Sequence, residues 1–592
     1  MHRNGYPPIG DYAVVGDGRT AALIASDGAV DWLCLPDVDS PSVFAAVLDA
    51  ERGGAFSLRP SDPFDAERRY IPGTNVLETT FRTAGGTVRL TDAMTLSPRG
   101  RLAPMRELVR KLECLDGVVE IEWSIEPRFD YARRIGWTST RDGRVFFTDG
   151  PDALTLSIWG AEPTASGRLR LAAAEEALFS LAATHNRPAV IPGRADTEER
   201  LAHTTSFWRG WAADAQWEGP WRDAVLRSIL ALKLLVFAPS GAIVAAPTTS
   251  LPESIGGARN WDYRYSWLRD ATFTLNALLA LGYFDAAHAF FWWFMHASRL
   301  TQPRLGVLYR VNGSSRIPER ELDHLSGYRR SKPVRTGNEA AKQVQLDLYG
   351  SVLDSIWLHA DSHGDLGADT GKATAKIADY VSREWPRPDS GIWEVRSEPR
   401  HFVQSKAMCW AALDRACRLA ERGLIPDRRQ TWRPGANAIQ AWIEQHGWDE
   451  ELGAYIRAPE DRELDASLLT LPLIEYDAGR DRLSSTIDAI RERLGAGGPL
   501  LYRYLGEDGV PGDEGAFTTC SFWLVDALAR VGRVDEAAAL MDDLVPLAND
   551  VGLFAEELDP SSGEHLGNFP QGLVHLALIN AAVSIRDAEE RR

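Results

Sequence analysis

The stretch Gly257–Gly282, GARNWDYRYSWLRDATFTLNALLALG, joins a loop crowded with rings and charges to an apolar helix. From Trp267 onward the apolar residues recur with helical periodicity, and Gly282 provides a stop signal. About twelve segments after Trp221 share this pattern. They begin near Trp221, Trp267, Phe284, Gln343, Gly371, His401, Asp427, Leu464, Leu483, Gly515, Arg533 and Gln571. A row of helices with long polar loops after alternate ones predicts an (α/α)₆ barrel, a toroid whose loops line a central funnel.

The first part of the chain has a different period. Up to about residue 195, Gly, Pro and Asp interrupt the sequence roughly every eight to twelve residues. The runs TVRLTDAMTL, VVEIEWSIEP, RVFFTD and ALTLSIWG alternate apolar with polar residues, as strands with one face on a core do. We therefore predict an N-terminal β-super-sandwich over residues 1–195, a helical linker over 196–217 and the barrel over 218–592.

Composition narrows the class of protein. The chain has 592 residues, 44% of them hydrophobic and 25% charged, which predicts a globular protein of two or more compact units. A formal net charge of −18 argues against a nucleic-acid partner, since phosphate binding needs clustered Lys and Arg. HExxH, paired CxxC and P-loop motifs are missing, so neither a metal nor a nucleotide cofactor is expected.

The sequence also bears on location. The N-terminal MHRNGYPPIGDYAVVGDG has Pro and Gly where a signal peptide carries its apolar region. The most apolar helical run, LRSILALKLLVFA, contains Arg227 and Lys233, so no membrane span is expected. The five cysteines are scattered, which favours reduced thiols in the cytoplasm over a disulfide framework. The sequence does not distinguish a monomer from a homo-oligomer.

Long loops of the second half carry the unusual residues. They are residues 243–268, 306–342, 386–400, 500–515 and 551–570. Two of them place a carboxylate near an aromatic residue: Glu394 follows Trp393, and Glu556 follows Phe554 by two positions. A pair of carboxyl groups serves glycoside hydrolysis, in which one protonates the leaving oxygen and the other activates water or attacks. Loop carboxylates are common in an acidic chain, so this pattern alone is weak.

Aromatic residues strengthen the sugar hypothesis. The chain has 20 Trp, several of them in loops beside Arg or Asp. Sugars present apolar C–H faces edged by hydroxyls. Proteins bind them with aromatic rings that stack on these faces and with side chains that make bidentate hydrogen bonds to the hydroxyls. We expect Trp267, Arg269 and Asp270 to form the floor of a pocket for one sugar.

These motifs together resemble glycoside hydrolase family 15, the glucoamylase and trehalase group, in its bacterial two-domain form. The resemblance spans nearly the whole chain, from the opening IGDYAVVGDGRTAALIASDGAVDWLCLPDVDSPSVFAAVLDA onward. Four further segments carry it in order: GAIVAAPTTSLPE with NWDYRYSWLRDATF, GIWEVRSEPRHF, YRYLGEDGVPGDEGAFTTCSFWLVDAL, and GLFAEELDPSSGEHLGNFPQGLVHLALI.

The resemblance implies a role for each matched residue. Glu394 would be the general acid and Glu556 the general base of an inverting reaction, with their carboxyl groups ~6.5–9.5 Å apart so that a water fits. The pKa of Glu394 would have to be raised towards neutrality. Arg269 and Asp270 would hold the hydroxyls at the far edge of the first glucose. The other candidate substrate contacts are Trp267, Tyr263, Trp393, Arg503, Glu557 and Arg335.

Several alternatives stay open at this point. Glu398 is a rival for the acid and Glu557 for the base. Asp262 and Tyr263 belong either to the pocket or to the shape of the loop, and Arg335 rests on a loose alignment. Weaker candidates for a place near the substrate are His401 and His324, together with Trp32, Asp37 and Asp39 on an N-terminal loop that would reach over the funnel.

The favoured function is an exo-acting, inverting α-glucoside hydrolase. It would need no cofactor and would release β-glucose from the non-reducing end of short α-gluco-oligosaccharides of the maltose or isomaltose type. The alternative is a trehalase that cleaves the α-1,1 bond of trehalose. Less favoured are an α-glucoside phosphorylase, which would lack the base carboxylate that Glu556 provides, and a non-catalytic sugar-binding protein.

Overall fold

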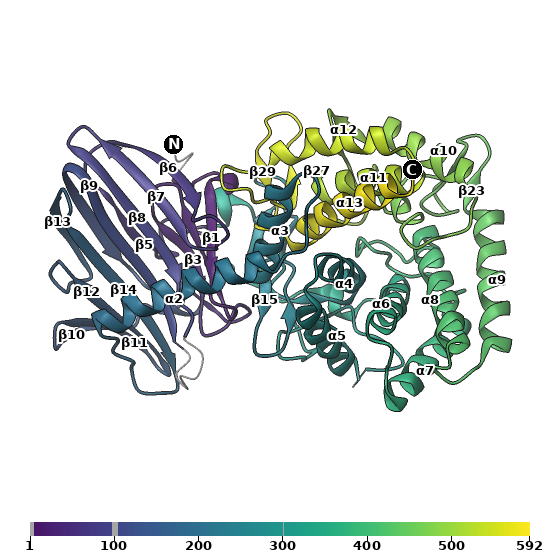
Figure 1. The fold of residues 1–592 in the computed structure, drawn as a ribbon, viewed down its shortest axis with the longest axis horizontal. Coiled ribbons are helices and arrows are strands. Elements are labelled where there is room, and N and C mark those ends of the chain that lie inside the picture. The colour runs from purple at the N-terminus through teal and green to yellow at the C-terminus, as the bar shows by residue number, and fades with distance from the viewer. Residues whose placement is uncertain (1–4, 98–104, 300) are drawn as a thin grey trace.

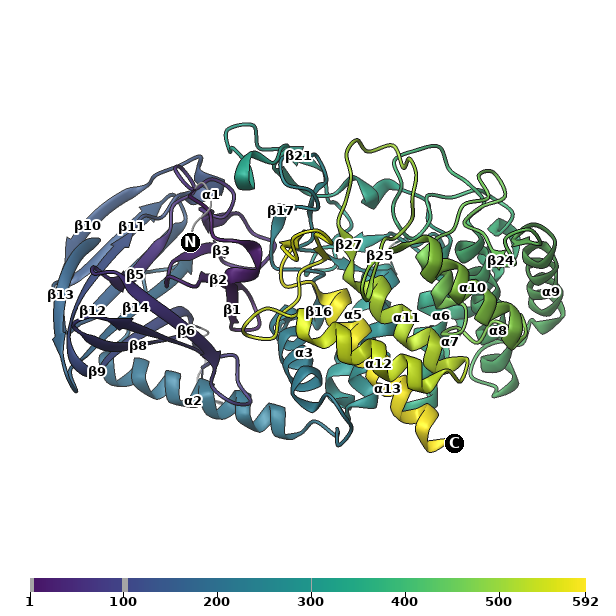
Figure 2. The same ribbon diagram turned by 90° about the horizontal axis from the view of Figure 1, so that it is seen from above.

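The computed structural model describes residues 5–97, 105–299 and 301–592. A strand-rich part is followed by a ring of helices, and the long helix α2 (Arg194–Ala213) runs along the sheets towards that ring (Figures 1 and 2). The buried Arg200 of α2 pairs with Glu107 of the sheet at 2.7 Å, which fastens the helix to the strands. This helix coincides with residues 196–213 of the predicted linker, and the domain limits stay a prediction.

The N-terminal strands form one antiparallel network in two layers. They are β1 (Tyr12–Gly16), β2 (Ala21–Ala25), β3 (Val30–Cys34), β4 (Ser42–Phe44), β5 (Phe56–Pro60), β6 (Phe64–Tyr70), β7 (Leu77–Thr83), β8 (Gly86–Met94), β9 (Arg106–Ile125), β10 (Trp137–Arg141), β11 (Arg144–Asp149), β12 (Asp152–Trp159), β13 (Ser166–Ala172) and β14 (Glu176–His185); the short helix α1 (Phe129–Ala132) precedes β10. Strand β9 joins the layers, because its first half pairs with β8 and β14 and its second half with β5 and β13.

The alternation read from the sequence is visible in these strands. In β5 every second residue is buried, and β7 buries Leu77, Thr79 and Phe81 while the residues between them face outward. Strand β1 packs across the sandwich on β7 and β8, so the apolar faces of the two layers meet in one core. The four runs quoted above lie in β8, β9, β11 and β12.

The second part is a double ring of helices. They are α3 (Arg222–Leu235), α4 (Ala271–Ala280), α5 (Phe284–Ser298), α6 (Asp347–His363), α7 (Ala368–Glu384), α8 (Val403–Glu421), α9 (Arg429–His446), α10 (Arg480–Arg493), α11 (Thr518–Arg530), α12 (Val534–Leu544) and α13 (Gly572–Glu590). An inner ring closes through α4, α6, α8, the 3₁₀ helix Ala466–Thr470, α11 and α13, each in contact with the next and α13 with α4. The remaining helices lie outside it (Figure 1). This arrangement is the predicted (α/α)₆ barrel.

The strands of the barrel half are short and lie in its loops. They are β15 (Val236–Phe237), β16 (Ala242–Ile243), β17 (Thr249–Pro252), β18 (Asn260–Asp262), β19 (Ser266–Trp267), β20 (Leu308–Tyr309), β21 (Arg320–Glu321), β22 (Arg335–Thr336), β23 (Trp448–Asp449), β24 (Ala454–Tyr455), β25 (Gly495–Gly497), β26 (Leu500–Leu501), β27 (Ala516–Phe517), β28 (Glu557–Leu558) and β29 (His565–Leu566).

One predicted helix differs from the element found in the structure. The segment expected as an α-helix near Leu464 is a 3₁₀ helix of five residues, Ala466–Thr470, started by Asp465, whose side chain accepts from the N–H of Ser467. Pro472 follows within two residues of its end and has no N–H to continue a helical ladder. The inner ring is thus closed by a short element at this position. Within the described residues, no helix is both long and apolar enough to cross a membrane.

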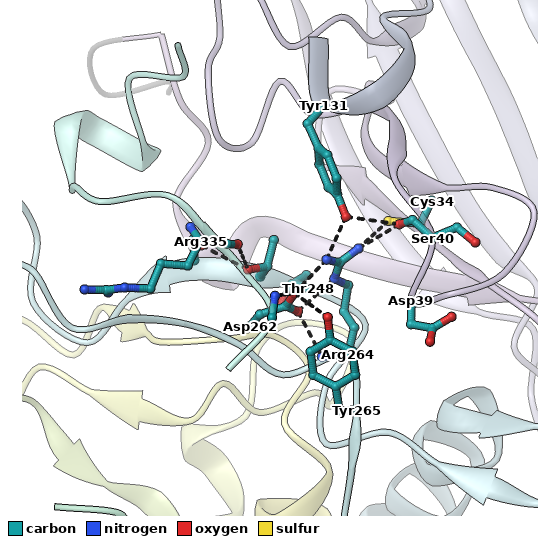
Figure 3. Close-up of polar contacts among 12 residues, drawn as sticks. Cys34, Asp39, Ser40, Tyr131, Thr248, Asp262, Arg264, Tyr265 and Arg335 are labelled. Atoms are coloured by element: carbon teal, nitrogen blue, oxygen red, sulfur yellow. Dashed lines mark hydrogen bonds and ion pairs between the residues drawn. The ribbon is translucent and has the colours of Figure 1, made fainter. Parts of the chain in front are cut away.

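The sandwich and the barrel share buried side chains. Leu230 and Leu234 of α3, together with Val551 and Leu553 from a barrel loop, lie in the same apolar cluster as the sandwich core. The polar centre of this contact is Arg264, which is 1% exposed (Figure 3). Its guanidinium forms a two-bond ion pair with the fully buried Asp262, at 2.7 and 2.9 Å.

The remaining donors of Arg264 reach into the sandwich domain. Arg264 donates to the carbonyl of Ser40 and to the hydroxyl of Tyr131, each at 2.8 Å, and one guanidinium nitrogen lies 3.4 Å from Cys34 Sγ (Figure 3). Asp262 also accepts from the N–H of Gly337 at 3.0 Å. One charged pair therefore joins two loops of the barrel to two loops of the sandwich.

We predict that Arg264→Met lowers the thermal midpoint of unfolding. The substitution leaves Asp262 buried without its partner charge, a change that costs about 3–5 kcal/mol in other proteins. The matched control is Arg168→Met, because the Arg168 side chain is 66% exposed and its ion contacts are long, at 3.9 Å. Scanning calorimetry of both variants measures the effect. Equal midpoints for Arg264→Met and Arg168→Met would contradict the structural role of the pair.

Candidate active site

The loop that follows β17 and β18 brings two aromatic rings to the mouth of the barrel. Tyr263 comes directly after β18, and Trp267 ends β19, just before the 3₁₀ turn that leads into α4. Their rings meet edge to face, with centroids 5.4 Å apart. Tyr263 donates its hydroxyl proton to Glu556 at 2.7 Å, and Trp267 Nε1 donates to Glu394 at 2.5 Å. The two predicted carboxylates are thus connected through one pair of rings.

Glu394 lies in a tight turn with unusual backbone geometry. Its φ is +60°, in the left-handed region that non-glycine residues rarely adopt, and its N–H bonds to the carbonyl of Gly391. Such a conformation costs of order 1–3 kcal/mol and persists only where the surroundings enforce it. Burial raises the pKa of Glu394, while the Arg269 guanidinium and the bond from Trp267 oppose that rise. A carboxyl group whose pKa is raised holds its proton more readily, as an acid catalyst must.

Arg269 ties the start of α4 to this turn. Its Nε donates to Asp270 at 2.9 Å, and its Nη1 donates to the carbonyl of Ile392 at 2.8 Å and lies 3.3 Å from Glu394. Trp393 is held from the other side, since its Nε1 donates to Asp465 at 2.8 Å. The side chains predicted for the pocket floor therefore surround Glu394.

Glu556 and Glu557 are neighbours with separate surroundings. Glu556 accepts from Tyr263 and more weakly, at 3.4 Å, from the N–H of Asn568. Glu557, in β28, accepts from the N–H of Gly515 at 2.8 Å. Burial raises the pKa of Glu556 to about 7, against the lowering effect of Arg503 and of the Tyr263 hydrogen bond. Burial also raises the pKa of Glu557.

Arg503 is the cation that faces this group of acids. It is 7% exposed and contacts Glu253 at 3.1 Å and Glu557 at 3.6 Å, and it forms a short ion pair with Glu514. Burial raises the pKa of Glu253 to about 8, although Arg503 opposes the shift. Arg503 is predicted from the sequence, whereas Glu253 and Glu514 are not; their only signal is their position in two loops that carry the family resemblance.

A cavity opens beside these groups. Tyr263, Trp393, Glu394 and Arg503 contribute to its wall, and its volume is about 470 Å³ including the part open to solvent. Glu556, at 1% exposure, is outside the wall and bonds to Tyr263, which is part of it. The wall combines rings with a few polar groups, as sugar-binding sites do.

Three other candidates, Asp262, Arg335 and Glu398, lie outside the cavity wall. Asp262 is turned towards Arg264 and shapes the loop, whereas Tyr263 lines the cavity. Arg335 donates to the carbonyls of Ala258 and Asn260 at 2.9 and 3.0 Å, so its guanidinium braces the loop. The exposed Glu398 is not part of the wall.

The histidines and the N-terminal loop have structural partners. His401 bonds to Glu460 at 2.7 Å, and His324 bonds to the carbonyl of Tyr131 at 2.6 Å. Trp32 Nε1 donates to the carbonyl of Pro247, and Asp39 pairs with Arg310, each at 2.8 Å. These last two residues touch the barrel but do not line the cavity. The other residue predicted on that loop, Asp37, pairs with Arg19 at 3.3 Å within the sandwich domain.

Comparison with known proteins agrees with both halves of the fold. The model of the glycosyl hydrolases family 15 matches residues 219–583, and that of the trehalase-like N-terminal domain matches residues 2–174. A protein named trehalase from Mycobacterium tuberculosis is 41% identical over 99% of this chain and 91% of its own length. A second trehalase, from Thermoplasma volcanium, is 34% identical over 99% of this chain and 95% of its own.

A solved structure shares the overall architecture. Bacterial glucoamylase complexed with acarbose superposes with a TM-score of 0.70, covering 98% of this chain and 94% of that one, at 13% sequence identity. At this identity the likeness concerns the fold, a sandwich followed by a helical barrel. The class of reaction is indicated by the family model and by the full-length relatives. The chain belongs to glycosyl hydrolase family 15 and is a glycoside hydrolase.

Proposed function

We propose that the protein is an inverting trehalase, with Glu394 as general acid and Glu556 as general base. The observation that carries the mechanism is the aromatic pair, in which Trp267 bonds Glu394 and Tyr263 bonds Glu556. The choice of substrate rests on the full-length relatives, which are named trehalase. These relatives favour trehalose, the alternative substrate in the sequence analysis, over malto- or isomalto-oligosaccharides. A cytoplasmic location is part of the proposal, supported by five cysteines that are buried and unpaired.

The proposed reaction needs only water. Glu394 gives its proton to the oxygen of the α-1,1 bond, and the bond between that oxygen and C1 of one glucose breaks. Glu556 removes a proton from a water molecule, whose oxygen forms the new bond to the same C1 from the opposite face. The attacked glucose leaves as the β anomer, and the other leaves as the α anomer with the bridging oxygen.

The surroundings suit this division of roles. Glu394 must be protonated before reaction, and its burial favours the protonated form. Glu556 must be ionised; burial raises its pKa to about 7, and Arg503 together with the Tyr263 hydroxyl limits that rise. Trp393, in the cavity wall, and Arg269, beside the acid, would contact the glucose that is attacked.

We predict that Glu394→Gln and Glu556→Gln each reduce kcat on trehalose by about 10²–10⁴-fold, the usual contribution of general acid–base catalysis. Circular dichroism should show that both variants stay folded. Two controls test the rival assignments. Glu398→Gln, at an exposed position in the same loop, should keep the wild-type rate. Glu557→Gln should retain more activity than Glu556→Gln; the reverse order would move the base to Glu557.

Trehalose should be the preferred substrate and should yield equal amounts of α- and β-glucose at first. Proton NMR at times short compared with mutarotation measures the two anomers. In H₂¹⁸O the label should enter β-glucose only, because water attacks one glucose and the bridging oxygen stays with the other. Two α anomers would contradict inversion. Faster initial hydrolysis of maltose or isomaltose in the same assay would contradict the trehalase assignment and leave the family unaffected.

Tyr263→Phe should move the acidic limb of the kcat/KM profile to higher pH. The hydroxyl stabilises ionised Glu556, so its loss raises the pKa of the base above about 7. A smaller fraction of Glu556 is then ionised at a given low pH than in the wild type, so the variant loses activity at low pH. A hydrogen bond to a charged group corresponds to a shift of about one pH unit. Tyr265→Phe is the control, since Tyr265 bonds Asp262. Acidic limbs at the same pH in both variants would contradict this link.

A further inference from the structure

Three histidines meet on the outer side of the barrel. His288 belongs to α5, whereas His359 and His363 lie four residues apart on α6 and so share one face of that helix. His288 and His363 are exposed, and His359 is 3% exposed beneath them. One ring nitrogen from each of the three lies within 4.8 Å of the other two.

The buried member is held by its neighbours. The ring of His359 stacks on Phe291, with centroids 3.7 Å apart and planes 5° from parallel. The rings of His359 and His363 stack at 4.5 Å, and His288 lies 5.4 Å from the first and 5.2 Å from the second. Phe291 is on the same helix as His288, so the packing of α5 against α6 brings the three rings together.

The hydrogen bonding of the rings suits metal binding. Ser362 Oγ lies 2.7 Å from His363 Nδ1, which leaves Nε2 of that ring for a ligand. In the described chain this is the one hydrogen bond to a ring nitrogen of the cluster. Such a partner orients a ligating histidine.

We propose that His288, His359 and His363 bind one divalent first-row transition-metal ion, such as Zn²⁺, that clamps α5 to α6. Imidazole nitrogen is a preferred ligand of these ions, and three histidines leave a coordination position for water. In a tetrahedral site, Zn–N bonds of about 2.0–2.1 Å place two ligand nitrogens about 3.4 Å apart. To bind the ion, the exposed rings of His288 and His363 must rotate out of their packing on His359, which brings nitrogens now within 4.8 Å of one another to that separation.

The proposed site is separate from the sugar cavity. Asp347, at the start of α6, is close enough to Arg269 and Glu394 for their charges to affect its pKa. His363 ends the same 17-residue helix, and a rise of about 1.5 Å per residue places it about 24 Å further along. The ion would therefore stabilise the fold without touching the reacting groups.

Calorimetric titration of the tag-free, EDTA-treated full-length protein with ZnCl₂ tests the proposal. The wild type should bind one equivalent, and its thermal midpoint should rise with zinc, because the ion binds the folded state. His288→Ala and His363→Ala, both at exposed positions, should each weaken zinc binding by about tenfold or more. Co²⁺ should give the wild type, but neither variant, the visible absorption of a four-coordinate complex.

His296→Ala is the matched control. His296 is an exposed histidine on α5 that packs on Trp292, outside the cluster. This variant should bind zinc as the wild type does, and all four proteins should hydrolyse trehalose at similar rates. Two results would overturn the proposal: no zinc binding by the wild type, or wild-type affinity in both His288→Ala and His363→Ala.

Discussion

The ion pair between Arg264 and Asp262 is the constraint on which the candidate site depends. Both residues are buried where the sandwich meets the barrel, and both lie next to Tyr263 in the chain. Because the guanidinium is fixed to loops of the sandwich, the backbone on either side of Tyr263 has little freedom. The sandwich thus contributes to the site by holding a loop, while its own side chains stay outside the cavity wall.

The barrel supplies the opposite wall through long connections between its helices. Glu394 comes from the segment before α8, Arg503 from the segment before α11, and Glu556 from the segment before α13. Each of these helices belongs to the inner ring, so the loops that precede them converge on one end of the barrel. The inner ring therefore sets the mutual positions of residues that are far apart in the sequence.

Periodicity was sufficient to predict the two halves of the fold. Alternation in runs such as RVFFTD and helical spacing after Trp221 correspond to β11 and to the barrel helices. The motifs also indicated the side chains that surround Glu394. Local patterns could not reveal that Arg264 bonds Tyr131 or that Glu253 contacts Arg503, since these contacts join distant segments. The positive φ of Glu394 has no sequence signal either, because glutamate is not a residue that favours that region.

The acids around Arg503 have a consequence for folding itself. Glu253 titrates at about 8 in the folded protein, far above an exposed glutamate, because it is buried. Between these two values the native chain binds a proton that the unfolded chain releases, so folding is accompanied by proton uptake. The stabilisation from this group is complete below the pKa of an unfolded glutamate, about 4.3, and is lost progressively as the pH rises from there to about 8. A rise in pH through the acidic and neutral range therefore weakens the fold at the same place where the sugar would bind.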